Sequence, residues 1–297
     1  MADRVRFFAA LLVNGLLAGA IYALLALAFV VVYKASGTIN FALGELAVLG
    51  SRLVAAGIHA MGLGLAGAGV GAGGAIAAIG VGFNRLVLRH LLGRPLIASI
   101  MVTLGLGALI RGTVPLVLGA VPGSIPLPLP DPFDVLGVLI AAEKLLAAVV
   151  AVVCIAGVGA FFRFTRTGLA LRAIADDQQV ALAMGIDVPG HLAITWAMAG
   201  GLSAVTGVLW TFGTGGGLGM LIIGLKVFPI LVIGGLDSAP GTMVGAALIG
   251  VLESVAAGYL DPLLGAGFSS VLPYLLLLTV LLIRPYGMFG SARIERV

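Results

Sequence analysis

Long runs of apolar residues follow one another along the chain, separated by short polar segments. Six of these runs are long enough for a helix that spans the hydrocarbon core of a bilayer, since such a helix needs about 20 mainly apolar residues. They lie at about 7–33, 62–83, 95–118, 137–162, 191–213 and 268–283. The pattern predicts an all-α, polytopic bundle of transmembrane helices that forms a single membrane domain over residues 1–297.

Two further apolar stretches are interrupted. Residues 39–57 contain Glu45 and Arg52, and residues 221–259 are interrupted by LDSAPG at 236–241. Broken or re-entrant helices are tolerated at membrane depth where protein or a water-filled cavity surrounds them. We expect six firm crossings, or eight if each interrupted stretch forms a hairpin.

Basic residues gather at the ends of the apolar runs. Eleven of the 16 lysines and arginines fall in four groups, whereas the connections 119–136 and 259–267 contain none. Because cytoplasmic loops carry an excess of Lys and Arg, this distribution places both termini, residues 84–94 and residues 163–190 in the cytoplasm. If 7–33 and 62–83 each cross once, residues 39–57 then dip into the membrane and return.

Composition supports the membrane assignment. Apolar residues make up 61% of the chain and charged residues only 9%, whereas a soluble domain carries about 25% charged residues. Glycine is abundant, at 46 residues, and the segment 64–82 is almost entirely small, which predicts close contact between helices. The net charge of +4 is spread over the ends of the apolar runs, so it does not indicate nucleic-acid binding.

The sequence lacks the motifs for phosphate binding and for metal binding. A phosphate-binding G-x-x-x-x-G-K-[ST] loop is absent, and none of the three lysines stands in one. There is no H-E-x-x-H and no cluster of cysteine and histidine, so we expect no metal site and no bound cofactor. The chain is therefore not expected to hydrolyse ATP through such a loop or to act as a metalloprotease.

The longest predicted cytoplasmic connection, 163–190, has a helix signature of its own. Asp176 fits an N-cap with Gln179 three residues later, and Gly185 fits the terminating position. A helix of about eight residues is marginal in water and needs a surface to pack against. Its apolar residues Val180, Ala181 and Met184 suit a groove on a partner protein, but the helix could equally lie on its own membrane domain.

Three ionisable residues fall within predicted membrane segments, namely Glu45, Arg111 and Glu253. Each costs about 2.5–3.5 kcal/mol at the bilayer centre on insertion scales, so each needs a compensating environment. Lining a polar cavity is one explanation; pairing between helices, or snorkelling towards an interface, is the other. Arg111 lies near the end of its run, which favours snorkelling.

Four motifs in order resemble one family of membrane proteins. They are TINFALGELAVLG at 38–50, TRTGLALRAIADDQQVALAMGID at 165–187, GLKVFPILVIGGLDSAPGTMVGAALIGVLES at 224–254 and IRPYGMFG at 283–290. Together they resemble the permeases of the branched-chain amino acid (high-affinity leucine) ABC import system, in particular the first of its two permease types. The chain departs from the family once, since Leu43 stands where the early motif usually has histidine.

The resemblance implies roles for individual residues. It places Asn40, Phe41, Glu45 and Glu253 along a translocation pathway. It makes the 163–190 connection a coupling segment that docks on a cytoplasmic ATPase, with the following residues in contact: Arg166, Thr167, Gly168, Arg172, Asp176, Val180, Met184 and Gly185. Leu43 bears on the cargo, because an apolar side chain replaces a hydrogen-bonding one.

The resemblance also implies partners: a second permease subunit of different sequence, two ATPase subunits that bind ATP and Mg²⁺, and an extracytoplasmic substrate-binding protein. The expected location is the bacterial inner membrane. The cargo implied is a branched-chain or related amino acid, a short amide or a carboxylate. The competing hypotheses are a secondary carrier that couples to an ion through Glu45 and Glu253, and a passive channel.

Overall fold

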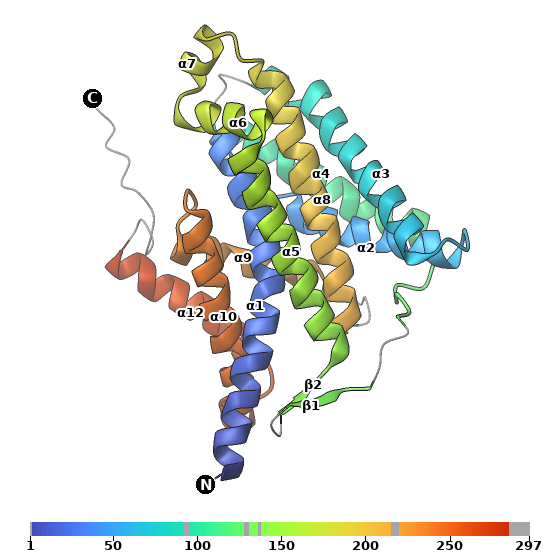
Figure 1. Ribbon diagram of the computed structural model, residues 1–297, viewed down its shortest axis with the longest axis vertical. Helices are drawn as coiled ribbons and strands as arrows, with labels where there is room; N and C mark the ends of the chain where they lie inside the picture. Colours follow the sequence, from blue (N-terminus) through green and yellow to red (C-terminus); the bar gives the residue numbers. More distant parts are fainter. Residues whose placement is uncertain (1, 92–95, 128–130, 136–137, 215–219, 285–297) are drawn as a thin grey trace. The chain divides into compact units, whose positions relative to one another are not determined.

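The computed structural model describes residues 2–91, 96–127, 131–135, 138–214 and 220–284. Helices account for nearly all of this part of the chain (Figure 1). Besides the helices there is one antiparallel hairpin of two three-residue strands, β1 (Phe133–Val135) and β2 (Val138–Ile140). The expected all-α bundle is confirmed, with this small hairpin added in the connection before α5. The C-terminal motif at 283–290 lies almost wholly outside the described residues.

Six helices are long and apolar enough to span a membrane. They are α1 (Ala2–Ser36), α3 (Leu65–Leu86), α4 (Leu96–Leu118), α5 (Ala142–Phe164), α8 (Val188–Thr214) and α10 (Ala239–Tyr259). Five of them match predicted runs. The sixth predicted run, 268–283, forms a helix at the predicted residues, α12 (Phe268–Ile283). With 16 residues, or about 24 Å at 1.5 Å per residue, α12 is shorter than the six candidate spans, and α10 is the sixth of these.

The second interrupted stretch is broken as expected, whereas the first forms one short helix that runs through Glu45 and Arg52. The first becomes α2 (Leu43–His59), a helix of 17 residues that follows a non-helical segment at 37–42. The second becomes α9 (Met220–Gly234) and α10, joined by a turn in which Gly235 has φ +90°. Ser238 caps α10 by accepting a hydrogen bond from the Gly241 N–H at 3.1 Å. Four shorter helices complete the described chain. They are η1 (Leu88–Leu91), α6 (Arg166–Asp176), α7 (Gln178–Ala183) and α11 (Asp261–Leu264).

The chain divides into two compact units. Unit 1 consists of residues 1–30, 127–152 and 225–297, and unit 2 consists of residues 31–126 and 153–224. The single membrane domain expected from the sequence stays a prediction.

In unit 1, α1 and α10 cross at small residues. A Cβ on Gly15 would stand 2.6 Å from the Val251 Cα, and one on Gly19 would stand 2.9 Å from the Ala246 carbonyl oxygen. The two glycines form a G-x-x-x-G pair, which lets helix backbones approach closely. Ser254 of α10 strengthens the contact by donating a hydrogen bond to the Leu11 carbonyl oxygen at 2.7 Å.

Unit 1 ends in a capped helix pair. The Asp261 carboxylate, at the start of α11, accepts hydrogen bonds from the Ser269 backbone N–H and hydroxyl, both at 2.8 Å. These bonds hold the pKa of Asp261 below its ordinary value. They also satisfy one of the free N–H groups in the first turn of α12.

In unit 2, α8 packs against α2 and α3 (Figure 1). Gly207 of α8 lies directly against the Ala47 backbone of α2, and a Cβ on Gly50 would stand 2.6 Å from the Ala204 Cβ. The C-terminal end of α2 is tied to the segment that follows α4. The Arg52 guanidinium donates to the carbonyl oxygens of Leu118 (2.7 Å) and Val121 (3.0 Å), and His59 hydrogen-bonds with that of Ser124 (2.8 Å).

The close contact predicted for residues 64–82 is present on one face of α3 only. Ala68, Ala72, Ile76 and Gly80 recur every four residues and are buried, and a Cβ on Gly80 would stand 3.0 Å from the Trp196 carbonyl oxygen of α8. The other face is open. An added Cβ would meet no atom of the described chain within 4 Å at Gly69, Gly71, Gly73, Gly74 and Gly82.

Candidate functional site

The non-helical segment before α2 brings three of the predicted pathway residues together in unit 2. The Asn40 side-chain oxygen accepts a hydrogen bond from the Ala42 N–H at 2.9 Å, and the Phe41 N–H donates to the Thr103 hydroxyl of α4 at 3.3 Å. Asn40 is 1% exposed, and its Nδ2 donates to no partner within the described ranges. A buried amide donor without a partner is costly. The Asn40 side-chain amide therefore has a hydrogen-bond donor that no described residue of the turn satisfies.

Glu45 lies in the first turn of α2, where the helix dipole favours a negative charge. Its carboxylate pairs with the Arg111 guanidinium of α4. The Glu45 side chain is 10% exposed and that of Arg111 is 62% exposed. The fold leaves room for the carboxylate because Gly107 of α4 lies beside it, where an added Cβ would stand 3.5 Å from the Glu45 Oε2.

Leu43 is fully buried in the same turn. In this conformation its side chain packs inside unit 2, so the replacement of the family's histidine alters the interior around the turn.

Glu253, the fourth predicted pathway residue, belongs to unit 1 and lies in a separate cluster. Its carboxylate pairs with the Lys226 ammonium of α9 and accepts a hydrogen bond from the Tyr22 hydroxyl of α1 at 2.7 Å. The side chains of Lys226 and Glu253 are 10% and 16% exposed. Helices α1, α9 and α10 therefore meet at one carboxylate, and α1 is far from the other two in sequence.

Both pairs join two helices, which is one of the explanations that the sequence left open; a role in lining a polar cavity stays a prediction. Glu45 and Glu253 each have a cationic partner, so neither is a free carboxylate that awaits an ion. Sequence reasoning missed Lys226, which is the one charged residue of α9. Its signal was present, because a lone lysine in an apolar run needs an opposite charge nearby.

The predicted coupling segment folds into two short helices, α6 and α7. Thr165 caps α6 by accepting a hydrogen bond from the Gly168 N–H at 2.9 Å. Gly168 is buried against the end of α5, where an added Cβ would stand 2.7 Å from the Phe162 Cα and would overlap the Phe161 carbonyl oxygen. Arg166 and Arg172 are exposed, and Thr167 is half-buried.

The predicted N-cap at Asp176 was wrong by one residue. Asp176 is the last residue of α6, and Asp177 caps α7 by accepting hydrogen bonds from the backbone N–H groups of Gln179 (2.8 Å) and Val180 (3.0 Å). Because α6 continues through Asp176, only the next aspartate has the extended backbone that an N-cap needs. The helix has six residues, fewer than the eight expected.

The predicted end of the helix at Gly185 is confirmed. Gly185 has φ +80°, its N–H bonds to the Leu182 carbonyl oxygen, and the Ile186 N–H bonds to that of Ala181, both at 3.0 Å. This pair of bonds is a Schellman motif, in which glycine supplies the left-handed backbone.

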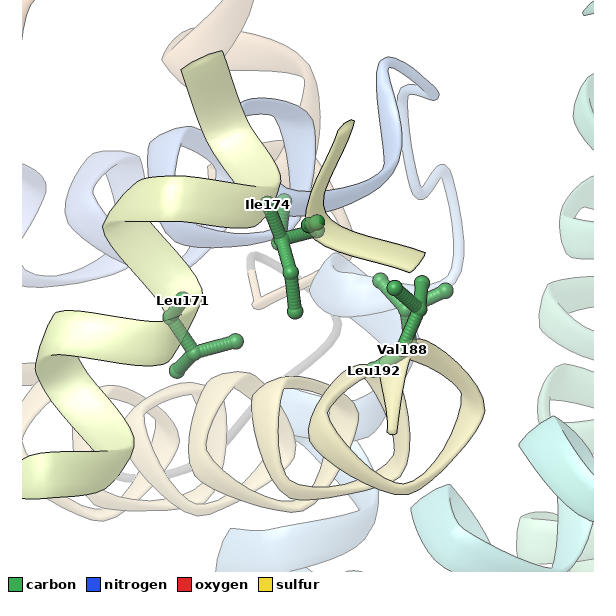
Figure 2. Close-up of a cluster of buried hydrophobic side chains, with 6 residues drawn as sticks. Leu171, Ile174, Val188 and Leu192 are labelled. Carbon is green, nitrogen blue, oxygen red and sulfur yellow. The ribbon is translucent and has the colours of Figure 1, made fainter. Parts of the chain in front are cut away.

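A hydrophobic cluster fixes the two helices on unit 2 (Figure 2). Leu171 and Ile174 of α6 point towards Val188 and Leu192 of α8 in that view. The remaining buried members are Ala35 and Ala181. The Gln178 side chain adds a hydrogen bond to the Ala35 carbonyl oxygen at 2.9 Å.

The three apolar residues of the predicted docking helix therefore separate. Ala181 is buried in this cluster, whereas Val180 is 58% exposed and Met184 is 78% exposed. Leu182 and Leu169 are exposed as well. One face of α6–α7 lies on its own domain, as one of the two alternatives expected, and the other face presents apolar side chains outward. Docking of that second face on a partner stays a prediction.

The family described as "Branched-chain amino acid transport system / permease component" matches residues 11–281. A high-affinity branched-chain amino acid transport system permease protein, BraD of Pseudomonas aeruginosa, is 32% identical and covers 96% of this chain and 97% of its own. The corresponding LivH proteins are 29% identical in Salmonella typhimurium, with full coverage of both chains, and 27% identical in Methanocaldococcus jannaschii, with 90% and 88% coverage. No solved structure matches the chain.

Proposed function

Because the chain belongs to the family of branched-chain amino acid transport system permease components, we propose that it forms half of the translocation pathway of an ATP-driven importer for branched-chain or related amino acids. The family assignment makes it a multi-pass membrane subunit of a transport system. The cargo, the partner subunits and the location in the bacterial inner membrane are parts of the proposal.

The α6–α7 segment is the observation that carries the coupling part of the proposal. It is fixed to unit 2 by the cluster around Leu171 and Ile174, and yet it exposes Val180, Leu182 and Met184. Exposed apolar side chains on a rigid two-helix projection suit insertion into a groove of another protein. Two ATPase subunits that bind ATP and Mg²⁺ are the partners proposed for this surface.

The proposed mechanism is alternating access driven from outside this chain. A loaded extracytoplasmic binding protein docks on the outer connections, and closure of the ATPases moves the α6–α7 segments of two permease subunits. The second permease is expected to be a different chain. Ion coupling by this chain alone is not favoured, because Glu45 and Glu253 are each held in an ion pair.

We further propose an orientation that differs from the charge-based expectation. The C-terminal end of α1 contacts α6–α7 through Ala35 and Gln178, so it belongs on the cytoplasmic side with the coupling segment. α1 is one helix of 35 residues, about 52 Å long, and a helix that spans once has its ends on opposite sides. The N-terminus is then extracytoplasmic, although Arg4 and Arg6 precede the apolar run.

The same orientation makes residues 36–59 a full crossing. The segment begins beside α6–α7 and ends at His59, which hydrogen-bonds with Ser124 in the connection predicted to be outside. It therefore does not return to its starting side. Cysteine labelling tests this: in a Cys154→Ala background, Arg4→Cys should react with an impermeant thiol reagent in intact cells, and Gln179→Cys only after permeabilisation. The reverse pattern contradicts the orientation.

The importer proposal is tested by co-expressing the chain with its genomic neighbours and measuring ATP hydrolysis and leucine uptake in liposomes. We expect both to rise when a leucine-loaded binding protein is added. Leucine transport by the purified chain alone, driven by an ion gradient, would overturn the ABC assignment.

A further inference from the structure

Arg111 occupies an unusual place for a charged residue. It lies within the candidate span Ile97–Leu118, seven residues before the end of α4, which is about 10 Å along the helix axis. Its side chain is 62% exposed on the chain itself, and apolar side chains of the same helix, Leu104 and Leu109, are exposed as well. In a lipid-facing position a guanidinium is unfavourable, because hydrocarbon offers it neither water nor a counter-ion.

Snorkelling to the nearer end of α4 does not explain the side chain. The Arg111 guanidinium reaches the Glu45 carboxylate, and that carboxylate lies beside Gly107, one turn nearer the start of α4. The side chain thus leans away from the nearer helix end and is held at depth by the pair. A charged group fixed in this way faces water or another protein subunit rather than hydrocarbon.

The pair has unused hydrogen-bonding capacity. A guanidinium carries five N–H donors, and within the described ranges Glu45 is the hydrogen-bond partner of this one, through Nη2. The second Glu45 oxygen accepts no hydrogen bond from a described residue. The site therefore offers free N–H donors on Arg111 beside a free carboxylate oxygen on Glu45. The donors suit a negatively charged group and the oxygen suits a positively charged one, so together they match a zwitterion.

We propose that Arg111 and Glu45 form a transient binding station for the backbone groups of an α-amino acid on the translocation route, an inference that rests on the proposed importer function. The cargo carboxylate binds the Arg111 guanidinium bidentately, and its ammonium group binds the Glu45 carboxylate. When the station is empty, the two side chains neutralise each other. The station recognises what all α-amino acids share and leaves the choice of side chain to the binding protein.

Uptake measurements separate this role from a merely structural pair. In the full importer in liposomes, Arg111→Gln should lower leucine uptake at least tenfold, while stimulation of ATP hydrolysis by the leucine-loaded binding protein stays within twofold of wild type. Glu45→Gln combined with Arg111→Gln removes both charges and leaves no unpaired ion. The double variant should stay as impaired as Arg111→Gln, and Arg85→Gln, which removes an exposed charge at the end of α3, should transport normally.

Thiol labelling supplies an independent readout. In a Cys154→Ala background, Arg111→Cys should react with a water-soluble thiol reagent in the assembled importer. Leu109→Cys is the matched control, because Leu109 is 62% exposed on another face of the same helix, and it should not react.

Three results would overturn the binding station and leave the importer proposal intact. They are normal uptake by Arg111→Gln, recovery of uptake in the double variant, and an unreactive Arg111→Cys. Absence of leucine uptake and of stimulated hydrolysis in the wild-type importer would overturn the proposed function, and the station with it.

Discussion

The cluster around Glu253 gives the sharpest stability prediction. Lys226→Met removes the counter-ion of a carboxylate whose side chain is only 16% exposed, and Tyr22 alone cannot neutralise it. An exposed ion pair contributes about 0–1 kcal/mol, but breaking a buried pair by removing one partner costs about 3–5 kcal/mol, because the remaining charge is buried without compensation. With the two side chains 10% and 16% exposed, the larger value applies.

The assay is equilibrium unfolding of the purified subunit in mixed micelles, with SDS as denaturant. We expect Lys226→Met to lower the free energy of unfolding by about 3–5 kcal/mol. The double variant Lys226→Met with Glu253→Gln should recover most of that loss, since neutral side chains of similar size replace the whole pair. Lys144→Met is the control, because Lys144 donates a hydrogen bond to Asn14 at an exposed position (3.0 Å) and should cost no more than about 1 kcal/mol.

Two results would refute this reasoning. A single variant that costs no more than the Lys144 control would mean that Glu253 is solvated rather than buried. A double variant as unstable as the single one would mean that the loss does not come from an uncompensated charge on Glu253.

Three further predictions concern the coupling segment and the end of unit 1. Gly168→Val should abolish uptake while the subunit still inserts, because its side chain would overlap the Phe161 carbonyl group; wild-type uptake by this variant would count against a fixed α5–α6 contact. Asp177→Ala should cost about 1 kcal/mol and weaken ATPase coupling, whereas Asp176→Ala should leave both unchanged, and equal effects in a stability and hydrolysis assay would contradict the assigned cap. Since hydrogen bonds from Ser269 lower the pKa of Asp261 in the folded state, their contribution is complete above the unfolded pKa of about 3.9 and is lost as the pH falls through the lower folded pKa; thermal unfolding against pH should lose this acid dependence in Asp261→Asn.

The helices were predictable from the sequence because apolar runs of spanning length permit little else in a bilayer. The break at 235–238 was also expected, because LDSAPG stands at 236–241. The break at 37–42 was not, since the expectation for 39–57 rested on Glu45 and Arg52, and α2 runs through both without interruption. The run at 268–283 formed a helix where it was predicted, and Gly265 and Gly267, both with positive φ, precede it. The spanning length of α10 was not recognised, because this helix lies within the stretch that was described as interrupted.

The candidate site was predictable only in part. Glu45 and Glu253 were identified as needing compensation, but their partners depend on which helices pack together, and that is not local information. The cap was assigned to Asp176 because two adjacent aspartates fit the same motif, and only the end of α6 decides between them. Gly15 and Gly19, by contrast, carried a usable G-x-x-x-G signal for the α1–α10 crossing.

The open face of α3 has a consequence for the stiffness of this helix. Glycine in a helix interior is less stable than alanine by about 0.5–1 kcal/mol. An added Cβ would meet no described atom within 4 Å at five glycines of α3, namely Gly69, Gly71, Gly73, Gly74 and Gly82. Alanine at these positions would restrict the unfolded backbone without repacking any neighbour in the chain. α3 is therefore a less stable helix than one of the same length without these glycines. A subunit in which several of them are replaced by alanine would show, in the uptake assay, whether transport depends on this low helix stability.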